Sequence, residues 1–166
     1  DGICYRTYPG THPEKGAYFT RGTSHDEYAR YTEDGNVNAE TLMRLMRKFR
    51  TASELVPEPL IEINGEDSCG IIFYGSSKPA VLEAKDILKT KNINVDLMQI
   101  RSFPFNLDVW EFIANHDRIY VVEQNRDSQM RTLIMAEGGI SAEVLRPLVH
   151  FTGCLLYTSP SPRDPK

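Results

Sequence analysis

The fold is decided by residues 69–124, which read CGIIFYGSSKPAVLEAKDILKTKNINVDLMQIRSFPFNLDVWEFIANHDRIYVVEQ. Residues 70–74 form an uninterrupted apolar run, which is typical of a strand buried on both faces of a parallel sheet. Two further strand patterns occupy residues 95–100 and 118–123, and stretches with apolar residues at helical spacing separate the three strands. Strands that alternate with helices predict right-handed crossovers, so the fold class is α/β with a parallel sheet.

One amphipathic helix precedes this core and another helix follows it. Asn38 is expected to cap the first, which ends before Pro57 because a residue preceding proline is driven out of the helical region. The second is expected to begin after Asn125 and to end at Gly138, and residues 148–151 predict a last strand. The first helix has an apolar stripe and, opposite it, a basic face that we interpret as solvated, in preference to a contact with nucleic acid or an acidic partner. The stripe consists of Leu42, Leu45, Met46, Phe49, Ala52 and Val56, and the basic face of Arg44, Arg47, Lys48 and Arg50.

The composition is that of an ordinary globular protein of 166 residues. A net charge of −4 argues against nucleic acid or an anionic membrane as the main partner, and no apolar run is long enough to span a bilayer. The three cysteines, at positions 4, 69 and 154, lack the spacing of a zinc or iron–sulfur site, which favours a reducing, cytoplasmic location and no cluster bound by this chain alone.

The two ends of the chain have a different character. Residues 1–36 lack long periodicity but are rich in aromatic side chains, so we expect them to pack on something, with a short strand at 17–20. Residues 60–67 are interpreted as a linker with one short strand at 60–63, and the domain boundary is placed near Glu66. The proline- and serine-rich residues 154–166 are expected to be a disordered tail.

Several possible sites fail on inspection. Residues 10–16, GTHPEKG, have the wrong order for a phosphate-binding loop. The turn Gly75-Ser76-Ser77 has amides that could bind an anion, but capping of the next helix explains its serines better. His25-Asp26-Glu27 are adjacent, so their side chains diverge, and a polar turn is favoured over a metal site. His116 lies near the end of a helix, where a partly charged imidazole is favourable for structural reasons.

Two polar stretches remain as candidates. The residues Glu123, Gln124, Asn125, Arg126 and Asp127 follow a buried strand, at the sheet edge where α/β proteins place ligands or interfaces. For this stretch, a functional or subunit contact and simple helix capping are equally good explanations.

The second candidate runs from Arg6 to Thr11, where a guanidinium and hydroxyl groups lie on a turn stiffened by Pro9. Such a set could bind a carboxylate through two parallel hydrogen bonds. The alternative for Arg6 is a surface ion pair with an acid such as Asp1.

At these residues the chain resembles a known family. GICYRTYPGTHPEKGAYFTRGTSHDEYARYTED at residues 2–34, and YVVEQNRDSQMRTLI at residues 120–134, resemble the C-terminal part of the alpha subunit of 2-oxoglutarate:ferredoxin oxidoreductase, a 2-oxoacid:acceptor oxidoreductase. Family members decarboxylate a 2-oxo acid with thiamine diphosphate, transfer the acyl group to coenzyme A and pass electrons through iron–sulfur chemistry to ferredoxin.

The resemblance implies the domain organisation. Residues 1–58 would be the trailing edge of a pyrimidine-side thiamine-binding domain with a linker helix. Residues 65–153 would be core domain II, a three-layer parallel-sheet domain like the transketolase C-terminal domain. The resemblance ends near Gly153, and residues 154–166 look like non-native sequence. The missing initiator Met suggests a fragment of a longer chain, which would not catalyse the reaction alone.

The resemblance also implies the site and the partners. Arg6 and Thr11 correspond to the segment near the bound 2-oxo acid, and Glu123 to Asp127 to the family's strand-end signature, at an interface or active-site edge. Thiamine diphosphate, magnesium and an iron–sulfur cluster are expected in the full complex, with a beta subunit as partner and ferredoxin and coenzyme A reached through that complex. No nucleic-acid or membrane partner is implied. The alternative function is a stand-alone α/β ligand-binding or protein-interaction module without a redox role.

Overall fold

The chain forms two compact units in a computed structural model that describes residues 1–16, 24–64 and 69–152. The first unit is Asp1–Val56 and the second is Pro57–Lys166, and each is described by itself. The predicted strand at residues 17–20, the boundary at Glu66 and the tail at 154–166 lie outside the described residues.

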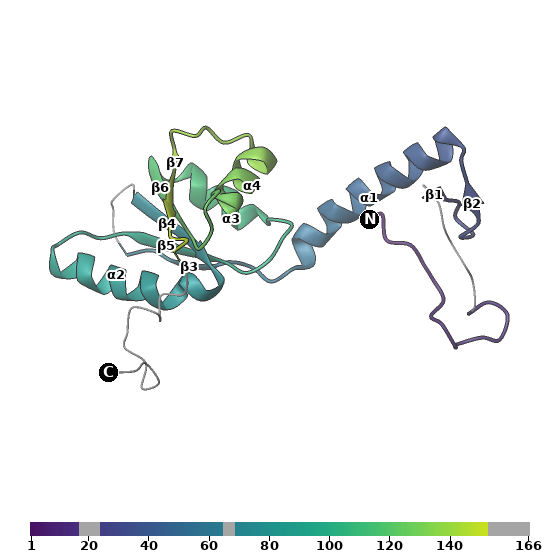
Figure 1. Cartoon of the computed structure of the whole chain (residues 1–166), viewed down its shortest axis with the longest axis horizontal. Coiled ribbons are helices and arrows are strands. Elements are labelled where there is room, and N and C mark those ends of the chain that lie inside the picture. Colours follow the sequence, from purple (N-terminus) through teal and green to yellow (C-terminus); the bar gives the residue numbers. More distant parts are fainter. Residues whose placement is uncertain (17–23, 65–68, 153–166) are drawn as a thin grey trace. The chain divides into compact units, whose positions relative to one another are not determined.

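The second unit is built on a five-stranded sheet in the order β3-β5-β4-β6-β7 (Figure 1). β4, β5, β6 and β7 run parallel, while β3 pairs antiparallel with β5 at one edge, so the prediction of an α/β fold is confirmed. The three strands predicted at the core are present. In chain order the elements are β3 (Leu60–Glu62), β4 (Cys69–Tyr74), a 3₁₀ turn (Gly75–Ser77), α2 (Lys78–Thr90), β5 (Asp96–Ile100), α3 (Leu107–Ala114), β6 (Arg118–Glu123), α4 (Gln129–Gly138) and β7 (Leu145–Val149).

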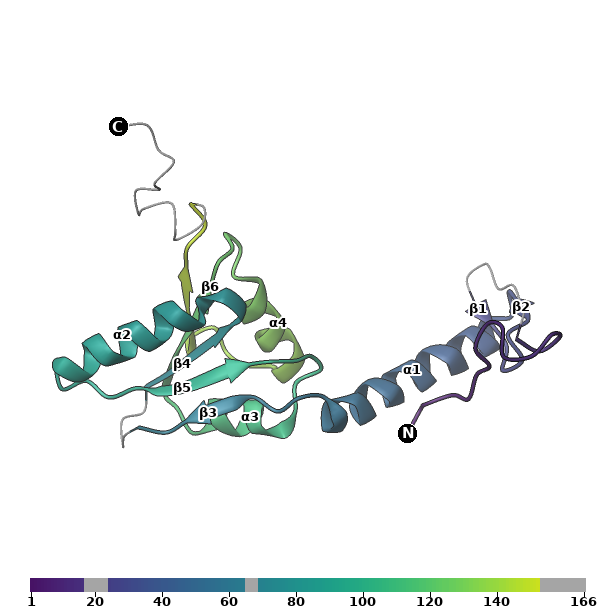
Figure 2. The same cartoon turned by 90° about the horizontal axis from the view of Figure 1, so that it is seen from below.

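Helices cover both faces of this sheet, which gives three layers (Figures 1 and 2). α2 covers one face, where Val81 packs with Ile71 and Phe73 of β4. α3 and α4 cover the other face over a larger core. Two cores arise because successive side chains along a strand point to opposite faces of the sheet. Each buried aliphatic side chain stabilises the fold by about 1.5–3 kcal/mol. The larger core contains Ile72, Met98, Ile100, Phe105, Val109, Phe112, Ile113, Ile119, Val121, Ile134 and Leu145.

The two edge strands compare differently with the prediction. The short strand predicted at residues 60–63 is present as β3, which pairs antiparallel with β5 and so belongs to the second unit. β7 begins at Leu145 and ends at Val149, earlier than the predicted strand at 148–151. Pro147 conceals the strand in the sequence, yet a proline is tolerated there because β7 is an edge strand.

The helix starts also required corrections. α1 (Gly35–Leu55) is capped by Asp34, whose carboxylate accepts the Asn36 amide at 2.8 Å, and not by Asn38. Ser77 precedes α2 but makes no capping hydrogen bond, so the capping explanation of the Gly75–Ser77 turn is wrong. The predicted glycine stop of α4 is confirmed, since Gly139 takes a left-handed conformation with φ of 62°.

The first unit contains α1 and a short antiparallel pair, β1 (Ser24–His25) with β2 (Tyr31–Thr32). α1 has no buried residue, and four members of the predicted apolar stripe, Leu42, Leu45, Met46 and Phe49, are exposed, while Ala52 and Val56 are half-buried. Leu42 is 54% exposed and Met46 55%. None of the described helices is long and apolar enough to cross a membrane.

Candidate functional site

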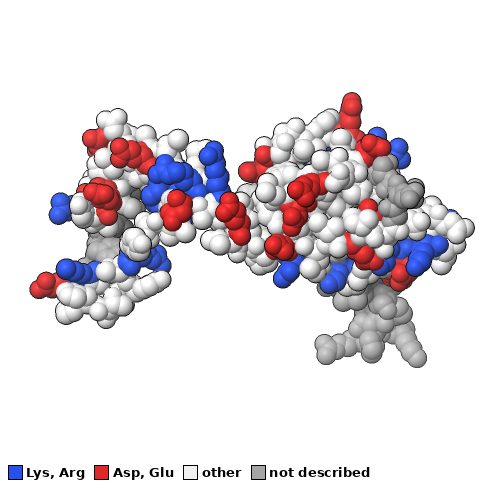
Figure 3. Space-filling model, turned by 180° about the vertical axis from the view of Figure 1, so that it is seen from behind, with Lys and Arg blue, Asp and Glu red and all other residues white. Residues whose placement is uncertain are grey.

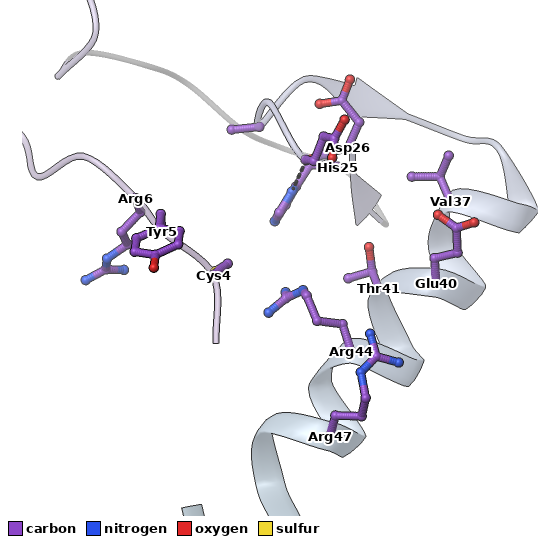
Figure 4. A pocket seen from close by; sticks show the side chains of 12 residues that line it. Cys4, Tyr5, Arg6, His25, Asp26, Val37, Glu40, Thr41, Arg44 and Arg47 are labelled. Carbon is purple, nitrogen blue, oxygen red and sulfur yellow. Dashed lines mark hydrogen bonds between the residues drawn. The ribbon is translucent and has the colours of Figure 1, made fainter. Parts of the chain in front are cut away.

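A cleft of the first unit lies between the N-terminal segment, the turn after β1 and the first turns of α1 (Figure 4). Its volume is about 500 Å³, which is the size of a small-molecule site. The lining residues are Cys4, Tyr5, Arg6, His25, Asp26, Glu27, Ala29, Val37, Glu40, Thr41, Arg44 and Arg47.

The N-terminal segment forms its wall of the cleft because it is bound along α1. The Arg44 Nη1 donates to the Gly2 carbonyl at 3.1 Å, and the Thr51 hydroxyl donates to the Asp1 carbonyl at 2.7 Å. Gly2 has φ of 77°, and a Cβ there would lie 2.4 Å from the Lys48 nitrogen. Only glycine therefore allows this close approach to the helix backbone.

The opposite wall is the turn after β1. One carboxylate oxygen of Asp26 accepts the amides of Tyr28, at 2.9 Å, and of Arg30, at 2.8 Å. This arrangement confirms the interpretation of His25-Asp26-Glu27 as a polar turn. In residues 1–16, 24–64 and 69–152 no group of three or more His, Cys, Asp or Glu side chains could hold a metal ion.

Charges are segregated around this cleft. Arg44 and Arg47 come from successive turns of α1, and Figure 4 shows the Arg44 guanidinium extending toward the segment that carries Cys4. Asp26 and Glu40 lie toward the other end of the cleft. Neither arginine has a carboxylate within ion-pair distance in the described part of the chain.

Arg6 lines the same cleft but makes a different contact. Its guanidinium carbon lies 5.2 Å from the centre of the Tyr8 ring, which is a cation–π geometry. Figure 4 shows this guanidinium on the side of the N-terminal segment away from α1. The alternative ion pair with Asp1 does not form among the described residues, because the Asp1 carboxylate accepts the Ile3 amide at 3.0 Å.

Thr11 does not join Arg6 at the cleft. Its hydroxyl donates to the Tyr8 carbonyl at 2.7 Å, and its amide donates to the same oxygen at 3.2 Å. Thr11 therefore closes the turn around Gly10, whose φ is 80°, and is not a lining residue.

The strand-end candidate in the second unit is largely explained by capping. Glu123 is 1% exposed, and its carboxylate accepts the amides of Met130 at 2.8 Å and Arg131 at 2.9 Å, which lie at the start of α4. A carboxylate there satisfies unpaired amides and complements the positive end of the helix dipole. The side-chain oxygen of Asn125 accepts the Gln129 amide at 3.2 Å, so the predicted capping role of Asn125 is present as well.

A tyrosine from the neighbouring strand joins this network. The Tyr74 hydroxyl lies 3.5 Å from the Glu123 carboxylate, which also accepts the Asn125 side-chain amide at 2.7 Å. Burial raises the pKa of Tyr74 above its ordinary value, and the negative charge of Glu123 raises this pKa further. β4 and β6 are adjacent, so the network links two neighbouring strand ends.

Three members of the candidate stretch are not needed for the cap. Gln124, Arg126 and Asp127 are exposed, and Arg126 pairs with Asp127 at 2.7 Å on the surface. An exposed pair of this kind contributes little to stability. These three side chains therefore remain accessible to a ligand or a partner.

Comparisons with known proteins were made for the whole chain. No family model matches it. A 2-oxoacid:ferredoxin oxidoreductase alpha subunit of Aeropyrum pernix is 29% identical over 164 residues, which cover 95% of this chain and 24% of that protein. The corresponding alpha subunit of Saccharolobus solfataricus is 29% identical over 124 residues, covering 72% of this chain and 20% of that protein. This chain is a relative of 2-oxoacid:ferredoxin oxidoreductase alpha subunits.

The resemblance predicted from the sequence is therefore confirmed, and the chain spans about a quarter of the length of these oxidoreductase subunits. Among solved structures, 2-oxoglutarate:ferredoxin oxidoreductase from Magnetococcus marinus, with 2-oxoglutarate, coenzyme A and succinyl-CoA bound, has a TM-score of 0.70. It is 22% identical, and the match covers 86% of this chain and 25% of that one, so it shows a shared fold.

One polar cluster of the second unit was missed by the sequence analysis. The Nδ1 of His116 faces the Phe112 carbonyl at 2.6 Å, and its Nε2 faces the Asp96 carboxylate at 3.2 Å. The other carboxylate oxygen of Asp96 accepts the Asn64 amide at 2.7 Å. Both Asp96 and His116 are buried, so the predicted structural role of His116 is confirmed, while its acidic partner comes from a distant strand that no local pattern indicates.

Proposed function

We propose that this chain is part of the alpha subunit of a thiamine diphosphate-dependent 2-oxoacid:ferredoxin oxidoreductase. That enzyme would decarboxylate 2-oxoglutarate, or a related 2-oxo acid, oxidatively, form the acyl-CoA and reduce ferredoxin. The observation that carries the proposal is the similarity to a 2-oxoacid:ferredoxin oxidoreductase alpha subunit over 95% of this chain. 2-Oxoglutarate is the first substrate to test, because the Magnetococcus marinus enzyme of similar fold was solved with that acid and coenzyme A.

The proposal divides the work between this chain and the rest of the complex. Residues 1–58 would belong to the edge of a thiamine-binding domain with its linker helix, and residues 65–153 to core domain II. The described residues offer no fitting donor set for a metal or cluster, with Cys4 in one unit and Cys69 in the other. In this proposal thiamine diphosphate, magnesium and the iron–sulfur cluster belong to the rest of a cytoplasmic complex, which includes a beta subunit. This chain alone would be inactive.

For the substrate site we propose the segment that begins with Arg6. Arg6 lies on the N-terminal wall of a cleft of suitable volume, and its guanidinium, which in this structure stacks on Tyr8 on the side away from α1, has no carboxylate partner in the described part of the chain. A 2-oxo acid brings a carboxylate that must be neutralised in a site with little water, and a guanidinium does so with two parallel hydrogen bonds. Thr11 contributes by fixing the turn after Pro9, since its hydroxyl binds the Tyr8 carbonyl.

For the strand end we propose an interface or an active-site edge. Gln124, Arg126 and Asp127 are exposed, while Glu123 and Asn125 fix the backbone behind them. The contact they would make is with another subunit or another domain of the same enzyme.

The whole proposal is tested by co-expressing the complete alpha subunit that contains this chain with its beta subunit. Purified anaerobically, the complex should reduce ferredoxin when 2-oxoglutarate and coenzyme A are both present. Pyruvate and 2-oxobutyrate serve as alternative substrates, since the choice of acid is part of the proposal. An assembled complex that reduces ferredoxin with none of these acids would reject the oxidoreductase and favour a module without a redox role.

The role of Arg6 is tested in the same complex. Arg6→Ala removes a charge-assisted contact worth roughly 1.5–3 kcal/mol, so kcat/KM for the 2-oxo acid should fall about ten- to a hundred-fold. Arg6→Lys should be intermediate, because it keeps the charge and loses the paired hydrogen bonds. If Arg6→Ala retains the wild-type kcat/KM, Arg6 only stacks on Tyr8 and the substrate site lies elsewhere.

A further inference from the structure

The cleft of the first unit has cations that the Arg6 proposal does not use. Thr41, Arg44 and Arg47 are spaced three residues apart on α1, which places them on one face of the helix. This face was interpreted from the sequence as a solvated basic surface. It instead forms a wall of the cleft, because the N-terminal segment packs along the same helix at Gly2.

Both guanidiniums on this wall retain donors for a ligand. Arg44 is half-buried and uses one N–H on the Gly2 carbonyl, which fixes its position. Its remaining N–H groups, and the whole guanidinium of Arg47, have no carboxylate partner in the described ranges. Thr41 lines the same cleft about one helical turn before Arg44.

Charge segregation gives the cleft a preferred orientation for a ligand. The acidic side chains of Asp26 and Glu40 lie toward the opposite end, away from Arg44 and Arg47 (Figure 4). Asp26 accepts two amide hydrogen bonds through one carboxylate oxygen, which holds its side chain in the turn after β1, and no ion pair joins it to Arg44 or Arg47 in the described ranges. A negative group of a ligand is therefore favoured at the arginine end only.

We propose that Thr41, Arg44 and Arg47 bind an oxyanion group of a ligand, separately from the carboxylate assigned to Arg6. This inference rests on the proposed function, which supplies two sources of such a group. One is the second carboxylate of a dicarboxylic 2-oxo acid, and the other is a phosphate of coenzyme A. The arms of the experiment distinguish them.

The experiment uses Arg47→Gln in the assembled enzyme, because the Arg47 side chain makes no hydrogen bond in the described structure that its removal would break. KM is measured for 2-oxoglutarate, for the monocarboxylic 2-oxobutyrate and for coenzyme A. Loss of a charge-assisted contact should raise one of these constants about ten- to a hundred-fold with kcat nearly unchanged. A selective rise for 2-oxoglutarate assigns the site to the second carboxylate, and a selective rise for coenzyme A assigns it to a phosphate. Arg44→Lys should act in the same direction.

Two control variants separate binding from structure. Arg50→Gln removes a cation from the same helix outside the cleft lining. Thr51→Val removes the hydrogen bond from the Thr51 hydroxyl to the Asp1 carbonyl, which holds the N-terminal segment on α1, without removing a charge. The inference is overturned if the Arg47 variant keeps all three wild-type KM values, loses only kcat, or changes no more than these controls.

Equilibrium dialysis with 2-oxoglutarate and with coenzyme A distinguishes failure of this inference from failure of the proposed function. The wild-type complex should bind at least one of the two ligands. For the ligand whose KM rises in the Arg47→Gln variant, the Kd of that variant should be about ten- to a hundred-fold higher than that of the wild type. A complex that turns over a 2-oxo acid, but whose Arg47→Gln variant binds both ligands normally, rejects the oxyanion site alone. A complex without turnover rejects the proposed function, and the dialysis then decides the oxyanion site on its own.

Discussion

The two units of this chain are stabilised in different ways. In the second unit, apolar side chains on both faces of one sheet are buried, and Ile72, Met98 and Ile119 are fully inaccessible. In the first unit, no apolar side chain among residues 1–16 and 24–56 is buried, and the large apolar side chains of the α1 stripe, Leu42, Leu45, Met46 and Phe49, are exposed. Acidic and basic side chains both occur on the surface of each unit (Figure 3), so the two units do not differ in the kinds of charge that they expose.

This difference in burial predicts that the second unit is stable by itself, whereas the first unit depends on other parts of the protein for its stability. Most helical stability in proteins comes from packing of an apolar face, and α1 has no buried residue in the described part of its unit. The N-terminal segment is attached to α1 by hydrogen bonds and by the close approach of Gly2. We therefore expect the second unit to fold alone, and the first to gain its stability from the remainder of the proposed complex.

The largest expected effect concerns the buried pair of the second unit. His116→Ala should lower the free energy of unfolding by about 3–5 kcal/mol, because it leaves the buried Asp96 carboxylate without the imidazole that it faces. Urea unfolding followed by circular dichroism measures this loss. The exposed neighbour Asp117 is the control, since Asp117→Ala should change stability by less than about 0.5 kcal/mol. Equal stability of the two variants would contradict the assignment of a buried, structural pair.

A core substitution compares the two units directly. Ile72→Ala should cost about 2–5 kcal/mol in urea unfolding, because it leaves a cavity between β4 and the α3–α4 layer. Leu42→Ala removes a similar side chain from the exposed stripe of α1 and should cost less than about 0.5 kcal/mol in the isolated chain. A comparable loss for Leu42→Ala would mean that the stripe is already packed.

The attachment of the N-terminal segment should respond to Gly2→Ala. The added Cβ meets the backbone of α1 at 2.4 Å from the Lys48 nitrogen, and the positive φ adds strain of about 1–3 kcal/mol. Trypsin should therefore cleave after Arg6 several-fold faster, with no change in the unfolding of the second unit. Gly10→Ala has a similar φ but open space around it, so it shows how much of the effect comes from strain alone. No acceleration in Gly2→Ala would mean that the segment is not held at Gly2.

The smallest expected effect is the pH dependence contributed by Tyr74. Its pKa is raised because its hydroxyl is partly buried and faces Glu123. A raised pKa in the folded state contributes stability that is present below the ordinary value of about 10 and is lost as the pH rises through the raised value. The unfolding free energy of Tyr74→Phe should accordingly fall less steeply than that of the wild type at alkaline pH. Parallel pH profiles would show that folding does not raise the pKa of Tyr74.

The sequence predicted the centre of the second unit well for a physical reason. β4, β5 and β6 are central strands of the sheet with helices on both faces, so each appears in the sequence as a short, mostly apolar run that is typical of such a strand. The short strand predicted at residues 60–63 is present as β3, whereas β7 was misplaced because Pro147 interrupts its pattern. The extent of an edge strand depends on pairing with a neighbour, which is not a local property.

The candidate sites were predictable only in part. Arg6 and the stretch that begins at Glu123 were recognised from their residue types and positions. The hydrogen bonds that Glu123 accepts could not be predicted, because they depend on where the first turn of α4 lies relative to the end of β6. The wall formed by Arg44 and Arg47 was missed because it requires the N-terminal segment to pack on a helix some forty residues away. The glycine at position 2, which permits that approach, was the only local signal.

The most direct test of this contrast is amide hydrogen exchange on the isolated chain and on the assembled complex. In the isolated chain, α1 should exchange rapidly while β4 and β6 exchange slowly, because only the strands belong to a packed core. In the complex, α1 should gain protection of at least a hundred-fold, corresponding to about 2.7 kcal/mol, and the strands should change little. If α1 is as protected as β4 in the isolated chain, or gains nothing in the complex, the first unit does not depend on the complex for its stability.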